Sequence, residues 1–443
     1  MTRPSCRHAL TVVIQPDGTV YPCICASWPK IQLGSIYQDD FFEIINSHEA
    51  RAFREQVHTG KYDLCRTEQC LPDFEPVTSQ ILDSIAASDY EIDHPRYYAL
   101  NYDPTCNLVC PSCRPTKLTL HRNQRATVLE FQERLFESGA LENATIHLTQ
   151  EGDPFASQVY WRLLKKLNNE RPVGIQLILQ TNGLGLTPKV VRELENLHSA
   201  IGTISVSIDA ATASTYAVVR GGNFELLLEN LDNLHRVFVL PGKAKLILNF
   251  VLQTANYQDV PQFLDLARRL GASCFIGMIG NKCMSNEVYQ THAVFDWRHP
   301  EFHKFINMMR SKSVRDASHV CWTNLSFFAQ PEREELSIGS VSRRMLASAS
   351  QSALFRPLMS GAASQSTRLR RLLKLLSQSV VLKRMLASVR RFVLIRRLLP
   401  VPKKSELLQS LLRENQSQRR SAEIRNIREV KHADSSRSEV ANK

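Results

Sequence analysis

The sequence contains no long hydrophobic run. No stretch of 18 consecutive apolar residues occurs in its 443 residues, so we expect no membrane-spanning helix. The opening residues, 1–6, lack the apolar stretch of a secretory signal, so we do not expect export. Eleven cysteines in such a chain favour metal ligands in a reducing cytosol over disulfides. The expected location is therefore the cytoplasm.

The first three quarters of the chain lack a net positive charge. The formal net charge is +12, yet residues 341–443 carry +17 and residues 1–340 carry −5. Residues 367–399 place leucines at helical spacing among arginines and lysines, which predicts a basic amphipathic helix. Such a helix suits an anionic membrane surface or an acidic partner. A helix packed on the protein body and a disordered tail are the alternatives.

Aromatic residues are nearly missing from residues 341–443. Only Phe355 and Phe392 occur there, and bases stack on aromatic side chains in many nucleic-acid sites. Nucleic acid is therefore the least expected partner. If the helix binds a membrane, the protein is peripheral to it.

A fourth cysteine is missing near the most informative motif. Cys106, Cys110 and Cys113 are separated by three and then two residues, just after the apolar run 97–102. Iron–sulfur clusters are normally held by four thiolates, so a three-thiolate loop leaves one iron open to another ligand. A zinc loop, or three unconnected thiols, is the alternative.

From residue 97 onward, short β-rich runs alternate with helical stretches. This pattern predicts right-handed βαβ crossovers and a parallel sheet, with chemistry at the carboxyl ends of the strands. The predicted strands are 97–102, 145–149, 175–181, 203–208, 246–252 and 274–279. The predicted helices include 157–168, 188–197, 223–237 and 260–270.

The three-cysteine spacing resembles the signature of the radical S-adenosylmethionine (SAM) superfamily. This resemblance, over about residues 97–280, implies an α/β fold built as an open (β/α)6 partial barrel; an ordinary doubly wound sheet is the alternative. It also implies a [4Fe-4S] cluster on Cys106, Cys110 and Cys113. In that family SAM chelates the open iron, and an electron from the cluster cleaves it to a 5′-deoxyadenosyl radical. A low-potential electron donor is then an expected partner.

Strand-end motifs add to the resemblance. Residues 151–155 look like the family's Gly-Gly-Glu-Pro motif, which holds the SAM amino group, although Glu151 and Asp153 depart from it. The resemblance assigns Gly152 and Asp153 to SAM binding. A helix N-cap is the alternative role for Asp153.

Three further strand ends carry residues that the resemblance assigns to SAM. Asn182 lies in a Thr-Asn-Gly turn, and Ser207 and Asp209 lie in a segment similar to Ser-Ile-Asp-Gly. Arg220 could pair with the SAM carboxylate, with a surface salt bridge as the alternative. Asn249 and Gln253 end the fifth strand, where they could face adenosine or substrate.

The first 75 residues hold a second cysteine set. A turn at residues 16–19 predicts a hairpin of strands 10–14 and 19–23, which would bring Cys6 and Cys23 together. Residues 40–60 are predicted to form a helix leading to Cys65 and Cys70.

This pattern resembles the SPASM or twitch domains that bind auxiliary iron–sulfur clusters. The resemblance implies a second [4Fe-4S] cluster on Cys6, Cys23, Cys65 and Cys70, with Cys25 as a substitute for Cys23. It would pass electrons to the SAM cluster or accept one from the substrate radical. A four-cysteine zinc site is the alternative.

The predicted organisation has five parts. These are an auxiliary-cluster domain (1–80), a linker (81–96), a radical SAM barrel (97–285), a barrel-closing segment (286–340) and a basic extension (341–443). The expected function is radical modification of a peptide, sugar or other small molecule. A non-catalytic iron–sulfur or zinc scaffold acting through the basic extension is the rival.

Overall fold

A curved, mostly parallel sheet forms the centre of the protein. The computed structural model describes residues 5–24, 31–65, 74–281 and 284–323, together with Leu325 and Phe328. Residues 1–333 belong to one compact unit. Its ten-stranded sheet has the order β12-β11-β10-β9-β8-β7-β6-β2-β3-β4, so strands β6 to β12 lie side by side in chain order. All neighbouring pairs from β6 to β12 are parallel.

Six of these strands are the ones predicted from the sequence. They are β6 (Tyr97–Leu100), β7 (Thr145–Leu148), β8 (Gln176–Thr181), β9 (Ile201–Ser207), β10 (Lys245–Leu252) and β11 (Ser273–Met278). The seventh, β12 (Val320–Trp322), pairs with β11 but was not predicted. With 3 residues it is too short to show the two-residue period of a strand.

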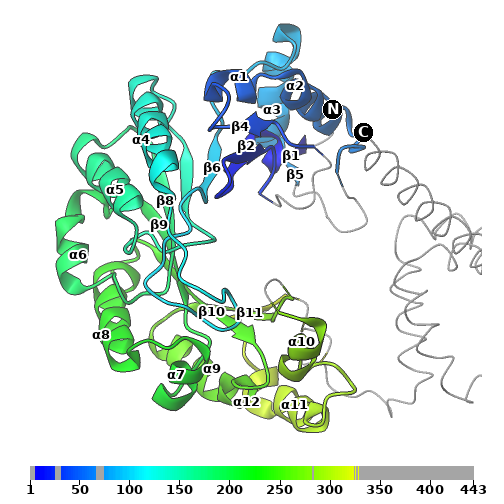
Figure 1. Cartoon of the computed structure of the whole chain (residues 1–443), viewed down its shortest axis with the longest axis vertical. Coiled ribbons are helices and arrows are strands. Elements are labelled where there is room, and N and C mark those ends of the chain that lie inside the picture. Colours follow the sequence, from blue (N-terminus) through cyan, green and yellow to red (C-terminus); the bar gives the residue numbers. More distant parts are fainter. Residues whose placement is uncertain are drawn as a thin grey trace, which may run out of the picture. The chain divides into compact units, whose positions relative to one another are not determined.

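Helices connect consecutive strands and lie on the outer side of the curved sheet, as Figure 1 shows for α4, α5, α6 and α8. Because strand order never reverses between β6 and β12, successive right-handed crossovers return along the same face. A doubly wound sheet reverses its strand order and carries helices on both faces, so that alternative is excluded. The predicted partial barrel is confirmed.

The connecting elements are α4 (Arg122–Glu137), α5 (Gln158–Glu170), α6 (Pro188–Glu193), η3 (Glu195–Leu197), α7 (Ala213–Val219), α8 (Phe224–Leu234), the π-helical turn η4 (His235–Val239), η5 (Tyr257–Asp259) and α9 (Val260–Arg269).

The two faces of the sheet differ in burial. Along β10, Leu246, Leu248, Phe250 and Leu252 are buried, whereas the alternate residues are half-buried or exposed. Residues two apart on a strand face the same side. The helix-covered face is therefore the core, and the inner face is open enough to line a site.

The amino-terminal hairpin extends the same sheet. Strand β2 (Thr11–Ile14) pairs in parallel with β6 and antiparallel with β3 (Thr19–Tyr21), which pairs with β4 (Gly34–Ser35). Gly18 has φ +81°, and a Cβ there would lie 2.3 Å from the Tyr37 ring, so only glycine fits this turn. The predicted hairpin is confirmed.

Two helices replace the single helix predicted over residues 40–60. They are α1 (Phe41–Ile45) and α2 (His48–Thr59), each with its own capping side chain, Asp40 and Ser47. Between them the Asn46 side chain donates to Ile92 O (2.9 Å) and accepts from Ile92 N (3.0 Å). These bonds to a distant segment and the cap at Ser47 explain the break.

The remaining elements flank this core. They are β1 (Ser5–Cys6), η1 (Arg7–Leu10), β5 (Phe74–Glu75), α3 (Pro76–Ile85), η2 (Ala86–Ser88), α10 (Asn286–His292), α11 (Phe302–Met309) and α12 (Lys312–Arg315). No helix among the described residues is both long and apolar enough to span a membrane. The predicted basic helix and the extension 341–443 lie outside the described residues.

Candidate cofactor site

The three-cysteine loop follows β6 at the carboxyl edge of the sheet. Cys110 is buried, Cys106 is half-buried and Cys113 is exposed. Cys110 O accepts from the backbone N–H groups of Cys113 (2.9 Å) and Arg114 (3.2 Å), a turn that brings the last two cysteines together. Burial raises the pKa of the Cys106 thiol, opposed by a hydrogen bond from Leu108 N at 3.4 Å. A bound iron would lower the pKa of the Cys106 thiol, because a thiol that coordinates a metal is deprotonated.

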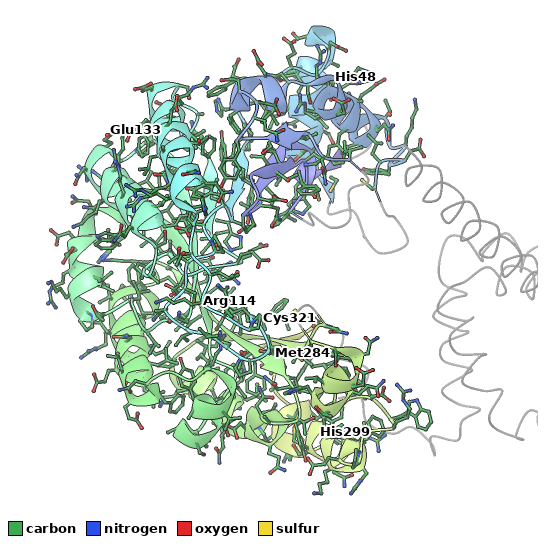
Figure 2. The ribbon with its side chains drawn as sticks, in the orientation of Figure 1. His48, Arg114, Glu133, Met284, His299 and Cys321 are labelled. Atoms are coloured by element: carbon green, nitrogen blue, oxygen red, sulfur yellow. The ribbon has the colours of Figure 1, made fainter. Side chains whose placement is uncertain are left out.

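The segment after β7 packs directly on this loop. A Cβ at Gly152 would lie 2.5 Å from Asp103 O and 2.7 Å from Thr105 O, so glycine permits the close approach. Arg114 Nη1 donates to Pro104 O (2.7 Å), and its Nη2 donates to Glu151 O. Figure 2 shows Arg114 on the inner side of the curved sheet, opposite the outer helix α4 that carries Glu133.

Asp153 joins the ends of two strands. Its Oδ2 accepts from Asn182 N (2.7 Å) and Thr181 Oγ1 (2.8 Å), and its Oδ1 accepts from Phe155 N (3.0 Å). Burial raises the pKa of this carboxyl, while the three bonds oppose the shift. Ser157, not Asp153, caps helix α5 through Tyr160 N, so the capping alternative for Asp153 is wrong.

Asn182 connects β8 to the cysteine loop. Its Nδ2 donates to Asn107 Oδ1 at 2.7 Å and lies 3.7 Å from Cys106 Sγ. Its backbone is held in turn by Asp153. The structure therefore brings the predicted residues Gly152, Asp153 and Asn182 together at the first cysteine.

Asp209 and Arg220 approach the loop from β9 and α7. Arg220 Nε lies 2.9 Å from Asp209 Oδ2, and Arg220 Nη1 donates to Cys110 Sγ at 3.5 Å. Both side chains are almost fully buried. The alternative of a surface salt bridge for Arg220 is therefore wrong.

Ser207 ends β9 on the inner side. It is half-buried and in register with Asn249 of β10, whose Nδ2 donates to Ser205 Oγ at 2.7 Å. Ser207 and Asn249 therefore lie side by side on neighbouring strands, and their roles toward SAM or substrate stay predictions.

Two residues that shape this edge were not predicted from the sequence. Asn256 Nδ2 donates to Asp209 O (2.8 Å) and Val251 O (3.0 Å). Asp259 Oδ2 accepts from Ala211 N at 2.7 Å and so fixes the chain after β9. Asp and Asn near a helix start usually indicate capping, so the sequence held no signal for these long-range contacts.

Three cysteines of the second set lie in the same packed cluster. Cys6, Cys23 and Cys65 pack in one cluster with apolar residues of α2 and α3, including Phe53, Val57 and Leu82. Cys65 N donates to Tyr62 O at 3.0 Å, which turns the chain after α2 back toward Cys6. Cys25 and Cys70 lie outside the described residues.

Two family models match the chain in these places. The model described as "Radical SAM superfamily" matches residues 100–267. The SPASM model, an iron–sulfur cluster-binding domain, matches residues 6–71. The chain is a radical SAM protein. Its SPASM segment precedes the barrel.

Relatives of known sequence support the same assignment. The AdoMet-dependent heme synthase of Methanosarcina barkeri is 26% identical over 183 residues, which are 41% of this chain and 49% of that protein. An uncharacterised protein of Methanocaldococcus jannaschii is 24% identical over 180 residues, 38% of this chain and 57% of that protein. The chain thus matches about half the length of these curated relatives.

The chain is also similar to a solved structure. Streptococcus suis SuiB bound to S-adenosylmethionine aligns over 73% of this chain and 74% of its own, with 13% identity and a TM-score of 0.36.

The radical SAM assignment implies SAM and a [4Fe-4S] cluster, and the SPASM segment implies an auxiliary cluster. Among the described residues, no three Cys, His, Asp or Glu side chains are already placed to hold a metal ion, so the fit to the first pair of cofactors rests on the polar surroundings of the loop. Buried polar atoms normally have partners. In the described part of the chain, several buried side-chain nitrogen or oxygen atoms lack a hydrogen-bond partner, and they include the Tyr216 hydroxyl and Gln253 Nε2.

Tyr216 lies in the electrostatic surroundings of the cluster loop. Burial raises its pKa to about 12, opposed by the charge of Arg220 and increased by that of Cys110. A neutral phenol donor beside the cysteines suits an anionic or polar ligand there. Such a ligand would satisfy the hydroxyl.

Proposed function

We propose that this chain reductively cleaves SAM and uses the product radical to modify a polar substrate. Cys106, Cys110 and Cys113 would hold the catalytic [4Fe-4S] cluster. When bound, cluster and SAM supply the electron and the 5′-deoxyadenosyl radical. The protein residues supply orientation and exclusion of water.

One observation carries the proposal. Side chains that follow β7, β8 and α7 meet at the three-cysteine loop, through Asp153–Asn182, Asn182–Asn107 and Arg220–Cys110. A structural zinc loop would not require contacts from three separate segments of the barrel. Those contacts suit a loop that must keep a fixed position beside a second ligand.

Two groups of residues would orient SAM. Gly152 and its neighbours offer backbone groups beside the loop, while Asp153 is 1% exposed and acts through the Asn182 segment it holds. Ser207 and the Tyr216 hydroxyl offer polar atoms on the β9 side. Arg220 and Asp209 would fix the loop at Cys110.

Uncharged polar side chains cross the inner face of the sheet. Tyr97 Oη lies 3.0 Å from His147 Nδ1, and His147 Nε2 lies 3.3 Å from Gln180 Oε1. Burial lowers the pKa of His147, opposed by Gln180, so the imidazole is neutral near pH 7. Such a lining suits hydroxyl or amide groups better than carboxylates or phosphates. This supports a sugar, another polyol or a peptide as substrate.

The auxiliary site would serve electron transfer. Cys6, Cys23 and Cys65 belong to one packed cluster, and the match of residues 6–71 to an iron–sulfur cluster-binding domain supports a common metal site. Cys70 is proposed as the fourth ligand from sequence alone. A low-potential donor in the cytoplasm would supply electrons to the protein, and the basic extension remains a candidate for peripheral membrane contact.

Anaerobic reconstitution tests the proposal. The purified chain, loaded with iron and sulfide and reduced with dithionite, should convert SAM to 5′-deoxyadenosine and methionine. A protein that takes up only zinc, or that binds iron without cleaving SAM, would support the scaffold function instead.

A further inference from the structure

Arg220 contacts a proposed cluster ligand directly. Its Nη1 donates to Cys110 Sγ at 3.5 Å, while its Nε faces Asp209 Oδ2 at 2.9 Å. The arginine side chain is 12% exposed and the aspartate side chain 4%. A guanidinium fork fixed at one end by a carboxylate points its other end at the thiol.

Neighbouring bonds fix this geometry. Asp209 has φ +60°, its Oδ1 accepts from Val251 N at 2.7 Å, and its carbonyl accepts from Asn256 Nδ2 at 2.8 Å. Arg220 follows α7, with its backbone N–H bonded to Tyr216 O at 2.8 Å. The Asp209 carboxylate and the Arg220 backbone are therefore both held in place.

We propose that Arg220 raises the reduction potential of the catalytic cluster through its bond to the Cys110 sulfur. The inference rests on the proposed function. Reduction adds one negative charge to a cluster, and hydrogen bonds to its sulfurs and nearby positive charge favour the reduced state. In a buried site such charged bonds are stronger than in water. Asp209 faces Nε of the guanidinium, while Nη1 is the nitrogen that donates to the Cys110 sulfur.

This role differs from the one that the sequence suggested. The family resemblance assigned Arg220 to the SAM carboxylate, which would make it a determinant of SAM affinity. The observed contacts instead make it a determinant of cluster potential that acts before SAM binds. The two roles predict different measurements.

The test uses the full-length holoprotein and a redox titration followed by electron paramagnetic resonance without SAM. The catalytic signal is first identified as the one that changes when SAM is added. For Arg220→Gln we expect about tenfold less reduced catalytic cluster at a fixed potential, a midpoint ~59 mV more negative for a one-electron couple. The auxiliary signal should keep its midpoint.

Arg269→Gln provides the matched control. Arg269 pairs with Asp232 at 3.0 Å, and both side chains are about half exposed. This variant should leave both midpoints unchanged. If Arg220→Gln fails to assemble the cluster, Arg220→Lys retains the charge but lacks the planar fork, and we expect a smaller negative shift.

An unchanged catalytic midpoint in the assembled variant overturns the inference. An unchanged midpoint together with weakened SAM binding would assign Arg220 to the SAM carboxylate. If no signal in the wild-type protein responds to SAM, the proposed function itself has failed, whatever the midpoints are.

Discussion

Asp153 Oδ2 accepts a hydrogen bond from Asn182 N at 2.7 Å, across the ends of β7 and β8. The same Asn182 side chain reaches Asn107 inside the cysteine loop. A buried carboxylate on one strand therefore positions the polar side chain of the next strand beside the first proposed cluster ligand.

We expect Asp153→Ala to weaken SAM binding and stability together. It would leave Asn182 N, Thr181 Oγ1 and Phe155 N without their acceptor, and unmade buried hydrogen bonds cost about 1–3 kcal/mol each. Isothermal titration with SAM and thermal unfolding of the reconstituted protein measure both effects. Thr187→Ala removes the cap of α6 instead and should cost about 1 kcal/mol with SAM affinity unchanged. Full SAM affinity in Asp153→Ala would contradict the positioning role.

Gly152→Ala should disrupt the site through backbone contact. The added methyl would lie 2.5 Å from Asp103 O, so the β7 end must move away from the cysteine loop. We expect a loss of about 1–3 kcal/mol in stability, as for other overpacked sites, and weaker SAM binding. Gly280→Ala is the control, because nothing lies within 4 Å of a Cβ there. If the two variants have equal stability and equal SAM affinity, the site does not require the close approach at Gly152.

The buried imidazole of His147 should make stability depend on pH. Burial lowers its pKa below the unfolded value of about 6.5, so the neutral ring contributes stability above that pH. The contribution is lost as the pH falls from about 6.5 toward the lower folded pKa, because the unfolded chain binds the proton first. In the His147→Gln variant, the melting temperature should fall less between pH 7 and pH 5 than it does in the wild-type protein. If the melting temperatures of the variant and the wild-type protein change equally with pH, His147 does not titrate in this way.

The auxiliary site makes a separate prediction. Changing Cys65 and Cys70 to Ala should remove about four irons per chain and leave SAM binding and uncoupled cleavage, while substrate turnover is lost. Metal analysis and a 5′-deoxyadenosine assay measure the two effects. Loss of zinc with no loss of iron would identify the amino-terminal site as structural.

The sequence predicted the barrel strands well because two-residue periodicity and βα alternation are local signals. It also predicted which strand ends meet, since parallel strands share one carboxyl edge. It could not predict that Asn256 and Asp259 hold the chain after β9, or that Arg220 bonds a cysteine. Those contacts join residues 47, 48 and 110 positions apart, so they depend on packing that no local pattern encodes. The broken helix at Asn46 has the same cause.

The most direct test replaces Cys106, Cys110 and Cys113 together with Ala. Wild-type protein should bind about eight irons as two [4Fe-4S] clusters, and the triple variant about four, with no 5′-deoxyadenosine formed from SAM. Cys321→Ala, an exposed cysteine on β12, should match wild type in both measurements. Formation of 5′-deoxyadenosine by the triple variant would contradict the assignment of this loop as the site of SAM cleavage.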